Sequence, residues 1–288
     1  MQSRVLHTRK RKAEALVFRV LMLGSVFLIA GCLAALLWSV ASRGLRALSW
    51  SMITQIPGGG FYIGKEGGIL NAILGSVYIS LGSVVLGLLI AIPAVLYLNA
   101  YHTRRTWFAG MTRLIFDVLF GIPSIVYGAF GFTIMVALGL KTSLLAGIIT
   151  VTLMIVPILA RAMDEVVRLA PRELSDATYS LGATRWETAQ VLLRYSLSGV
   201  LTAILLAFGR AIGDAATVLF TAGYTDSVPT SLHEPAATLP LAIFFQLSSP
   251  MEVVQDRAYA AAVILTVIVL AVSLAGKYCH HRLSKHKT

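Results

Sequence analysis

The chain has 288 residues, of which 57% are hydrophobic and only 13% are charged, and its mean hydropathy is +0.80. Soluble domains carry about 25% charged residues, so this composition excludes an ordinary soluble enzyme, a disulfide scaffold and a disordered chain. The two cysteines, Cys32 and Cys279, lie near opposite ends and predict no disulfide framework. Apolar stretches of about 20 residues instead predict an all-α integral membrane protein, because lipid offers no partner for open backbone groups.

Six membrane-spanning helices are predicted in chain order. They cover residues 16–41, 69–98, 114–138, 143–163, 191–221 and 258–276. The chain then divides into a basic N-terminal segment (1–15), the first span, an outer loop (42–68), a transmembrane domain (69–276) and a basic tail (277–288). Pro93, Pro123 and Pro157 fall inside three of the spans and are expected to bend them.

The Lys and Arg residues predict which ends face the cytoplasm. An even number of spans puts both termini on one side, and 18 of the 24 Lys and Arg residues lie in the termini and in segments 99–113 and 161–194. The positive-inside rule therefore places both termini in the cytoplasm. The net charge of +11 is explained by this topology, so we expect contact with membrane lipid and no binding of nucleic acid.

Two short motifs look like functional sites but have simpler explanations. Residues 29–32 resemble a lipoprotein cleavage site, yet the apolar run continues beyond Cys32, which favours an uncleaved first span. Residues 59–65 have the Gly-x4-Gly-Lys spacing of a phosphate-binding loop, but Glu66 stands where Ser or Thr would hold magnesium. We therefore expect no nucleotide or other cofactor on this chain.

Metal binding and catalysis are also not expected. His233 and Glu234 are adjacent, and residues 279–281 read Cys-His-His, but neither group has the three or four converging ligands that a metal site needs. No catalytic triad and no paired carboxylates are found. The leucine-rich segment 239–247 has about nine residues, too few to span a bilayer, and is predicted to be a re-entrant or surface helix at the outer mouth.

The cytoplasmic segment 161–190 does not have the composition of a linker. Pro171 suits a first helical turn, and Gly182 can end that helix in a left-handed turn before a second helix begins. Leu174, Ala177 and Leu181 are spaced three and four apart, so they are expected to share one face. An apolar face in the cytosol favours docking of a partner protein, and a helix lying on the membrane surface is the alternative.

This segment resembles the EAA loop of ABC importer permeases, which inserts a coupling helix into a cleft of the ATP-binding subunit. The resemblance rests on Asp176-Ala177-Thr178 followed by Gly182, although the family usually has Glu-Ala-Ala, and its closing Leu-Pro is Arg194-Tyr195 here. It implies contacts with an ATPase subunit from Leu174, Asp176, Ala177, Thr178, Leu181, Gly182 and Ala183.

Four further segments narrow the resemblance. Residues 121–128, 181–186, 209–216 and 238–244 are similar in order and spacing to phosphate-specific ABC importer permeases of the PstA type. The resemblance implies a type I (MetI-like) permease core in the bacterial cytoplasmic membrane, a cytoplasmic ATPase dimer that binds ATP, a second permease subunit and an extracytoplasmic phosphate-binding protein. A permease for molybdate, tungstate or sulfate, or an intramembrane enzyme acting on lipid phosphates, remains the alternative.

Charged residues inside the fifth span indicate a polar pathway. Arg210 and Asp214 are four apart, so one helical face would hold both, and Thr217 and Thr221 would continue that face. Arg210 would attract the oxyanion, because its planar donors match phosphate oxygens in pairs, and Asp214 would hold Arg210 between transport events. A purely structural ion pair and a proton relay are the alternatives. Asp117 is expected at the membrane interface, beside Arg113.

Overall fold

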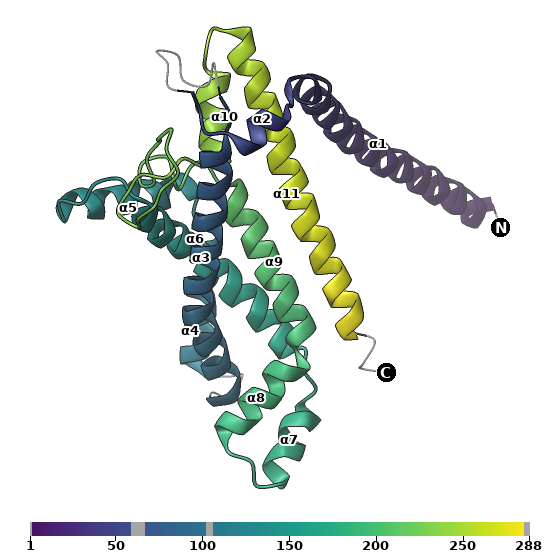
Figure 1. Cartoon of the computed structure of the whole chain (residues 1–288). Coiled ribbons are helices and arrows are strands. Elements are labelled where there is room, and N and C mark those ends of the chain that lie inside the picture. The colour runs from purple at the N-terminus through teal and green to yellow at the C-terminus, as the bar shows by residue number, and fades with distance from the viewer. Residues whose placement is uncertain (1, 59–66, 102–105, 285–288) are drawn as a thin grey trace.

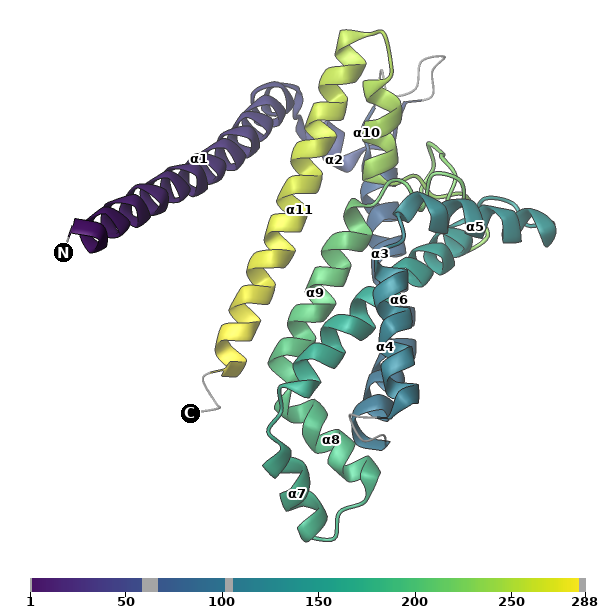
Figure 2. The same cartoon turned by 180° about the vertical axis from the view of Figure 1, so that it is seen from behind.

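A computed structural model describes residues 2–58, 67–101 and 106–284, except for the side chains of 2–10, 13 and 279–284. Every regular element within these ranges is a helix (Figures 1 and 2). The long helices are α1 (Gln2–Ala47), α3 (Leu70–Leu96) with its π-helical continuation η1 (Tyr97–Tyr101), α6 (Leu144–Arg168), α9 (Leu197–Gly213) and α11 (Glu252–Ser284). The shorter helices are α2 (Trp50–Thr54), α4 (Trp107–Phe120), α5 (Ser124–Ala137), α7 (Arg172–Ser180), α8 (Arg185–Tyr195) and α10 (Leu239–Leu247).

Four of these segments are long and apolar enough to cross a membrane without a break. They are Glu14–Ala47, Leu70–Tyr101, Leu144–Arg168 and Glu252–Tyr278. Two more candidate spans are helix pairs bent sharply in the middle, so the predicted number of six is reached when each pair is taken as one span. All the predicted spans therefore correspond to helical segments, but two of them differ in shape from a straight helix.

The third predicted span, 114–138, is two helices that meet at 96°. The break falls between Phe120 and Ser124, where Pro123 disfavours helical geometry in the residue before it. The helical segment also begins at Trp107, seven residues before the predicted start, so Arg113 belongs to a helix and not to a loop. The fifth predicted span, 191–221, is likewise bent by 70° between α8 and α9, and its helix ends at Gly213.

Helices α3, α6 and α9 form the main core of the molecule. Ile155, Leu159 and Ala160 of α6 are fully buried in it. At Gly87 of α3 a Cβ atom would lie 2.9 Å from Leu159 Cδ1, so the small residue allows close packing of the two helices. The Ser83 hydroxyl donates a hydrogen bond to the Ile148 carbonyl at 3.0 Å across the same pair, a contact worth about 1 kcal/mol in a membrane.

The two ends of the molecule carry different short helices. Helices α2 and α10 lie at one end and α7 and α8 at the other, which separates the predicted outer loops from the predicted cytoplasmic segment (Figure 1). Helix α10 has the predicted bounds, and its first turn is capped by the Thr238 hydroxyl, which accepts the Leu241 N–H. Its buried residues, among them Leu239 and Ala242, pack into a second core with α3 and α11.

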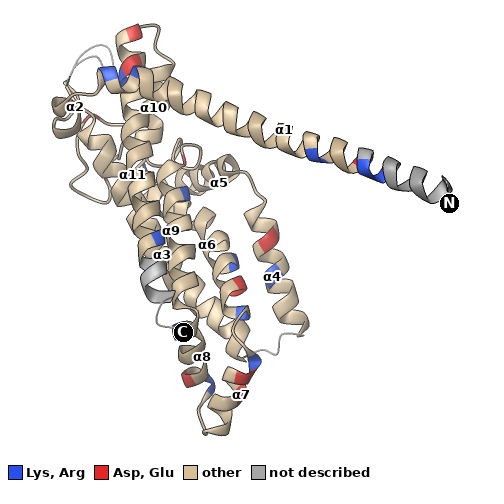
Figure 3. Ribbon diagram, turned by 90° about the vertical axis from the view of Figure 1, so that its right-hand side faces the viewer, with Lys and Arg blue, Asp and Glu red and all other residues tan. Residues whose placement is uncertain are grey.

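Helix α1 extends away from the rest of the molecule (Figures 1 and 2). It contacts α11 near its C-terminal end, where the Arg43 guanidinium lies 5.0 Å from the Tyr259 ring and 3.5 Å from the Asp256 carboxylate. No residue of its most apolar stretch is buried, and no charge occurs between residues 20 and 42 (Figure 3). The helix runs unbroken through Cys32.

Candidate functional site

Gly182 lies in the turn that ends helix α7. Its φ of +80° is left-handed, and its N–H donates to the Tyr179 carbonyl at 3.0 Å. The next N–H, of Ala183, donates to the Thr178 carbonyl at 3.1 Å. Together these two bonds satisfy the last carbonyls of the helix in the usual glycine-terminated manner. The predicted helix–glycine–helix geometry is therefore present at the end of the molecule formed by α7 and α8.

The second helix of this segment is held at its start by a reciprocal cap. The Thr184 hydroxyl accepts the Glu187 N–H at 3.3 Å, and the Glu187 carboxylate accepts the Thr184 N–H at 2.7 Å. Caps of this kind stabilise a helix by about 1 kcal/mol. The turn between α7 and α8 is thus fixed on both sides, by the glycine turn before it and by the cap after it.

Some of the residues predicted to contact an ATPase subunit are exposed, and others contact the rest of this chain. Leu181 is 87% exposed, and Asp176 and Ala177 are exposed as well. Leu174 instead packs against the main core, and the Thr178 hydroxyl hydrogen-bonds that of Thr188 at 3.1 Å. Leu174 and Leu181 therefore differ in burial. Leu181 caps the end of α7, with its N–H bonded to the Ala177 carbonyl at 3.2 Å, and its side chain lies outside the core that Leu174 contacts.

Among the described residues no ion pair joins Arg210 to Asp214, and helix α9 ends between them. Asp214 follows the last helical residue in an extended conformation, and its carboxylate accepts the Thr217 N–H at 2.8 Å. Arg210 is exposed on α9, and no carboxylate of the described residues lies within ion-pairing distance of it. Arg210 and Asp214 are therefore separate polar groups in this conformation.

Thr217 and Thr221 are fully buried in turns after α9 and do not extend an exposed polar face. The Thr217 hydroxyl donates to the Ser124 carbonyl at 3.3 Å, and the Thr221 hydroxyl donates to the Thr217 carbonyl at 3.1 Å. Both hydroxyls are bonded to backbone carbonyls. The Ser124 carbonyl belongs to α5, so Thr217 helps to pack this turn against α5. Of the four predicted pathway residues, Arg210 has the exposed charge.

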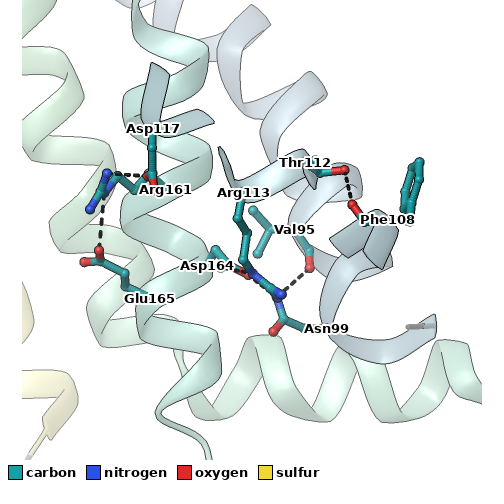
Figure 4. Close-up of polar contacts among 9 residues, drawn as sticks. All are labelled: Val95, Asn99, Phe108, Thr112, Arg113, Asp117, Arg161, Asp164 and Glu165. Carbon is teal, nitrogen blue, oxygen red and sulfur yellow. Dashed lines mark hydrogen bonds and ion pairs between the residues drawn. The ribbon is translucent and has the colours of Figure 1, made fainter. Parts of the chain in front are cut away.

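A cluster of charged residues that was not predicted from the sequence lies where α4 crosses α6 (Figure 4). The Asp164 carboxylate, only 6% exposed, accepts a hydrogen bond from Arg113 Nε at 2.7 Å. Asp117 pairs with Arg161 of α6 and not with Arg113, its predicted neighbour, and Arg161 also lies 3.4 Å from Glu165. The predicted fourth span ended at residue 163, whereas α6 continues to Arg168 and so carries Asp164 inside a helix, not in a loop.

A small cleft of about 110 Å³ opens beside this cluster. It is lined by Arg113, Phe116, Asp117, Arg161, Asp164, Glu165 and Arg168. The cations and carboxylates are equal in number, so the cleft has no net charge and its ion pairs mainly hold α4 on α6. Among the described residues, no three His, Cys, Asp or Glu side chains converge as metal ligands would.

Comparisons with known proteins identify the family of the chain. Residues 83–285 match the family model described as "Binding-protein-dependent transport system inner membrane component". The chain is 34% identical over 278 residues to the phosphate transport system permease protein PstA of Yersinia pestis, covering 96% of this chain and 93% of that protein. It is 35% identical over 242 residues to PstA of Xylella fastidiosa Temecula1, covering 83% of each chain.

The fold is also found in a solved structure. An inward-facing structure of the MetNI methionine ABC transporter matches with a TM-score of 0.61 and 19% identity, covering 75% of this chain and 95% of that chain. At this identity the match shows a shared fold alone, that of an ABC permease. The matched family model covers most of the chain, and PstA relatives exceed 30% identity over nearly its whole length. The chain therefore belongs to the family of binding-protein-dependent transport system inner membrane components, among the relatives of the phosphate permease PstA.

Proposed function

We propose that this chain is a membrane subunit of an ATP-driven importer that carries inorganic phosphate across the bacterial cytoplasmic membrane. It is a transport subunit and not an enzyme. The main support for phosphate is the extended similarity to permeases that are named for phosphate transport. These names do not favour molybdate, tungstate or sulfate, nor an enzyme acting on lipid phosphates.

The exposed α7–α8 turn supports coupling to ATP hydrolysis on a separate cytoplasmic subunit. Leu181 projects from a turn that a left-handed glycine and a helix cap hold in place. In this proposal Leu181, Asp176 and Ala177 contact the ATPase, whereas Leu174 attaches α7 to the permease core and Thr178 attaches it to α8. ATP binds to the partner dimer, and this end of the molecule faces the cytoplasm, as the Lys and Arg distribution predicts.

Two exposed surfaces support assembly with a second permease subunit. Among the described residues, the apolar length of α1 contacts the rest of the chain only near the C-terminal end of α1. On α9, Thr202, Leu206 and Arg210 are exposed at four-residue spacing, so this helix face presents one cation beside uncharged side chains. In this proposal Arg210 lines the phosphate path between the two subunits, and the loops beside α10 receive the extracytoplasmic phosphate-binding protein.

Uptake by the reconstituted importer tests this function. Vesicles containing the full chain with its importer subunits and internal ATP are expected to accumulate radiolabelled phosphate, with little competition from sulfate or molybdate. Leu181→Asp places a charge in the proposed ATPase contact and is expected to abolish uptake while the chain still inserts. Uptake of sulfate or molybdate without uptake of phosphate would refute the proposed substrate.

A further inference from the structure

The last turn of the second span is a π-helix, η1, which is a rare conformation found frequently at functional sites. It follows Pro93, whose ring lacks an N–H and interrupts the regular helical hydrogen bonding just before the turn. Because a π-turn holds one more residue than an α-turn, it changes the direction in which the following side chains point. Asn99 is the middle residue of η1.

The Asn99 side chain joins η1 to the buried carboxylate of α6. Its Nδ2 donates to the Val95 carbonyl at 2.9 Å and to Asp164 Oδ1 at 2.7 Å (Figure 4). Asp164 also accepts two hydrogen bonds from Arg113 of α4, at 2.7 and 3.2 Å. Three segments, η1, α4 and α6, therefore meet at one carboxylate that is almost completely shielded from solvent.

The other side of η1 contacts the coupling segment, which consists of α7, α8 and the turn between them. Arg185, the first residue of α8, places its guanidinium 5.8 Å from the Tyr101 ring and donates to the Tyr101 carbonyl at 3.4 Å. Helix α8 packs along η1 over this stretch. Asp164 is connected to the same segment through the chain itself, because α6 ends four residues later and leads into α7.

These contacts form a closed ring from α6 through α7, α8 and η1 back to Asp164. A displacement of the α7–α8 turn must then move η1 and the end of α6 together, as long as Asn99 holds Asp164. Without that contact Asp164 keeps its partner Arg113, so the core can remain folded. The last turn of the second span, however, would then be joined to the coupling segment only through Arg185 and the packing of α8 on η1, and no longer through Asp164.

We infer that Asn99 is a positioning residue that makes the second span follow the movement of the coupling segment. This inference rests on the proposed function and adds to it a route by which ATP hydrolysis reaches the membrane helices. Asn99 acts through Asp164 and Arg185 and contacts no substrate.

The test compares ATP hydrolysis and phosphate import on the same vesicles of the assembled importer. Asn99→Leu has nearly the shape of Asn but no donors, and it should lower phosphate imported per ATP hydrolysed about 10-fold, because a hydrogen bond to a charged group is lost. Thr112→Val is the matched control, since it removes one hydroxyl bond, to the Phe108 carbonyl at 3.0 Å, within α4 alone. The ratio in this control should equal that of the wild type.

A second variant tests the contact of η1 with α8, on the other side of the ring. Arg185 is exposed, so Arg185→Gln should fold even if Asn99→Leu does not, and it should lower the same ratio. Since both changes open one ring, the double variant should be no worse than the more affected single variant. A ratio unchanged from wild type, or multiplicative losses in the double variant, would overturn the inference.

Absence of phosphate import by the wild type would instead count against the proposed function, and the ratio can then be measured with the ion that is carried.

Discussion

The Asp214 carboxylate accepts the Thr217 N–H at 2.8 Å, so it stabilises the turn that follows α9. Arg210, on the last turn of α9, has no such local partner among the described carboxylates. An exposed guanidinium within an apolar segment is costly unless it meets another subunit, water or a passing anion. At the scale of single residues, Arg210 is therefore the best candidate for contact with phosphate.

Neutralising the two residues separately tests this assignment. Arg210→Gln is expected to lower uptake by about 10- to 150-fold, because one charge-assisted contact is lost. Asp214→Asn keeps an oxygen that can accept the Thr217 N–H, so uptake should change little, and the double variant should match Arg210→Gln. Uptake is measured per correctly inserted chain. Recovery of near wild-type uptake in the double variant would mean that Arg210 serves packing alone.

At the scale of elements, the short helices α7 and α8 depend on the turn between them. A Cβ at Gly182 would meet no atom within 4 Å, so the cost of a side chain there comes from the backbone and not from a clash. The left-handed φ of +80° is strained for any L-residue, most of all for a β-branched one.

Gly182→Val is expected to cost about 1–2 kcal/mol and to weaken ATPase binding while membrane insertion continues. The matched control is Gly139→Val, since Gly139 also has a left-handed φ, of +67°, and open space, but lies after α5. Co-purification of the ATPase subunit with each variant is the measurement. Equal loss of the ATPase in both variants would show that strain anywhere in the chain, and not the coupling turn, is responsible.

The loop after α9 has its own pH-sensitive contact. The pKa of the Glu234 carboxyl is lowered from 4.5 by hydrogen bonds from the Thr230 N–H and then from the Thr230 hydroxyl. A carboxyl whose pKa falls on folding stabilises the loop above its unfolded pKa, and this stabilisation is lost as pH falls through the lower folded pKa. The loop should therefore loosen only below about pH 4.5.

A fluorescent label on a cysteine in place of His233 measures this loosening. Label mobility should rise as the pH falls below 4.5 in the parent chain. With Glu234→Gln, the charged acceptor is absent at every pH, so mobility should be high and independent of pH in this range. An identical pH response in the two chains would assign the transition to a different group.

At the scale of the whole molecule, the α7–α8 turn and the loops beside α10 lie at opposite ends (Figure 1). Charged residues of both signs gather on α4 and α6, and the middle of α1 has none (Figure 3). This separation matches a chain that is anchored in a bilayer, with one end available to an ATPase and the other to a binding protein.

Cysteine labelling tests the orientation of these ends. In a chain with both native cysteines replaced by Ser, cysteines at Ser180 and Leu232 should react from opposite sides, because each residue is exposed at a different end. A membrane-impermeant maleimide added to intact cells should label position 232 and not position 180. Labelling of position 180 from outside would reverse the topology inferred from the Lys and Arg distribution.

The sequence by itself determined the membrane class, the helical segments and the glycine turn after α7, because each depends on neighbours along the chain. Helix α10 and Gly182 are local features of this kind. Only the tertiary structure decided where helices bend and which charges meet. The spacing of Arg113 and Asp117 suggested a pair, yet each binds a partner on α6, since the bend after Phe120 and the length of α6 bring those helices together. Likewise, four-residue spacing could not place Asp214 beside Arg210, because the end of α9 at Gly213 depends on packing that the local pattern does not contain.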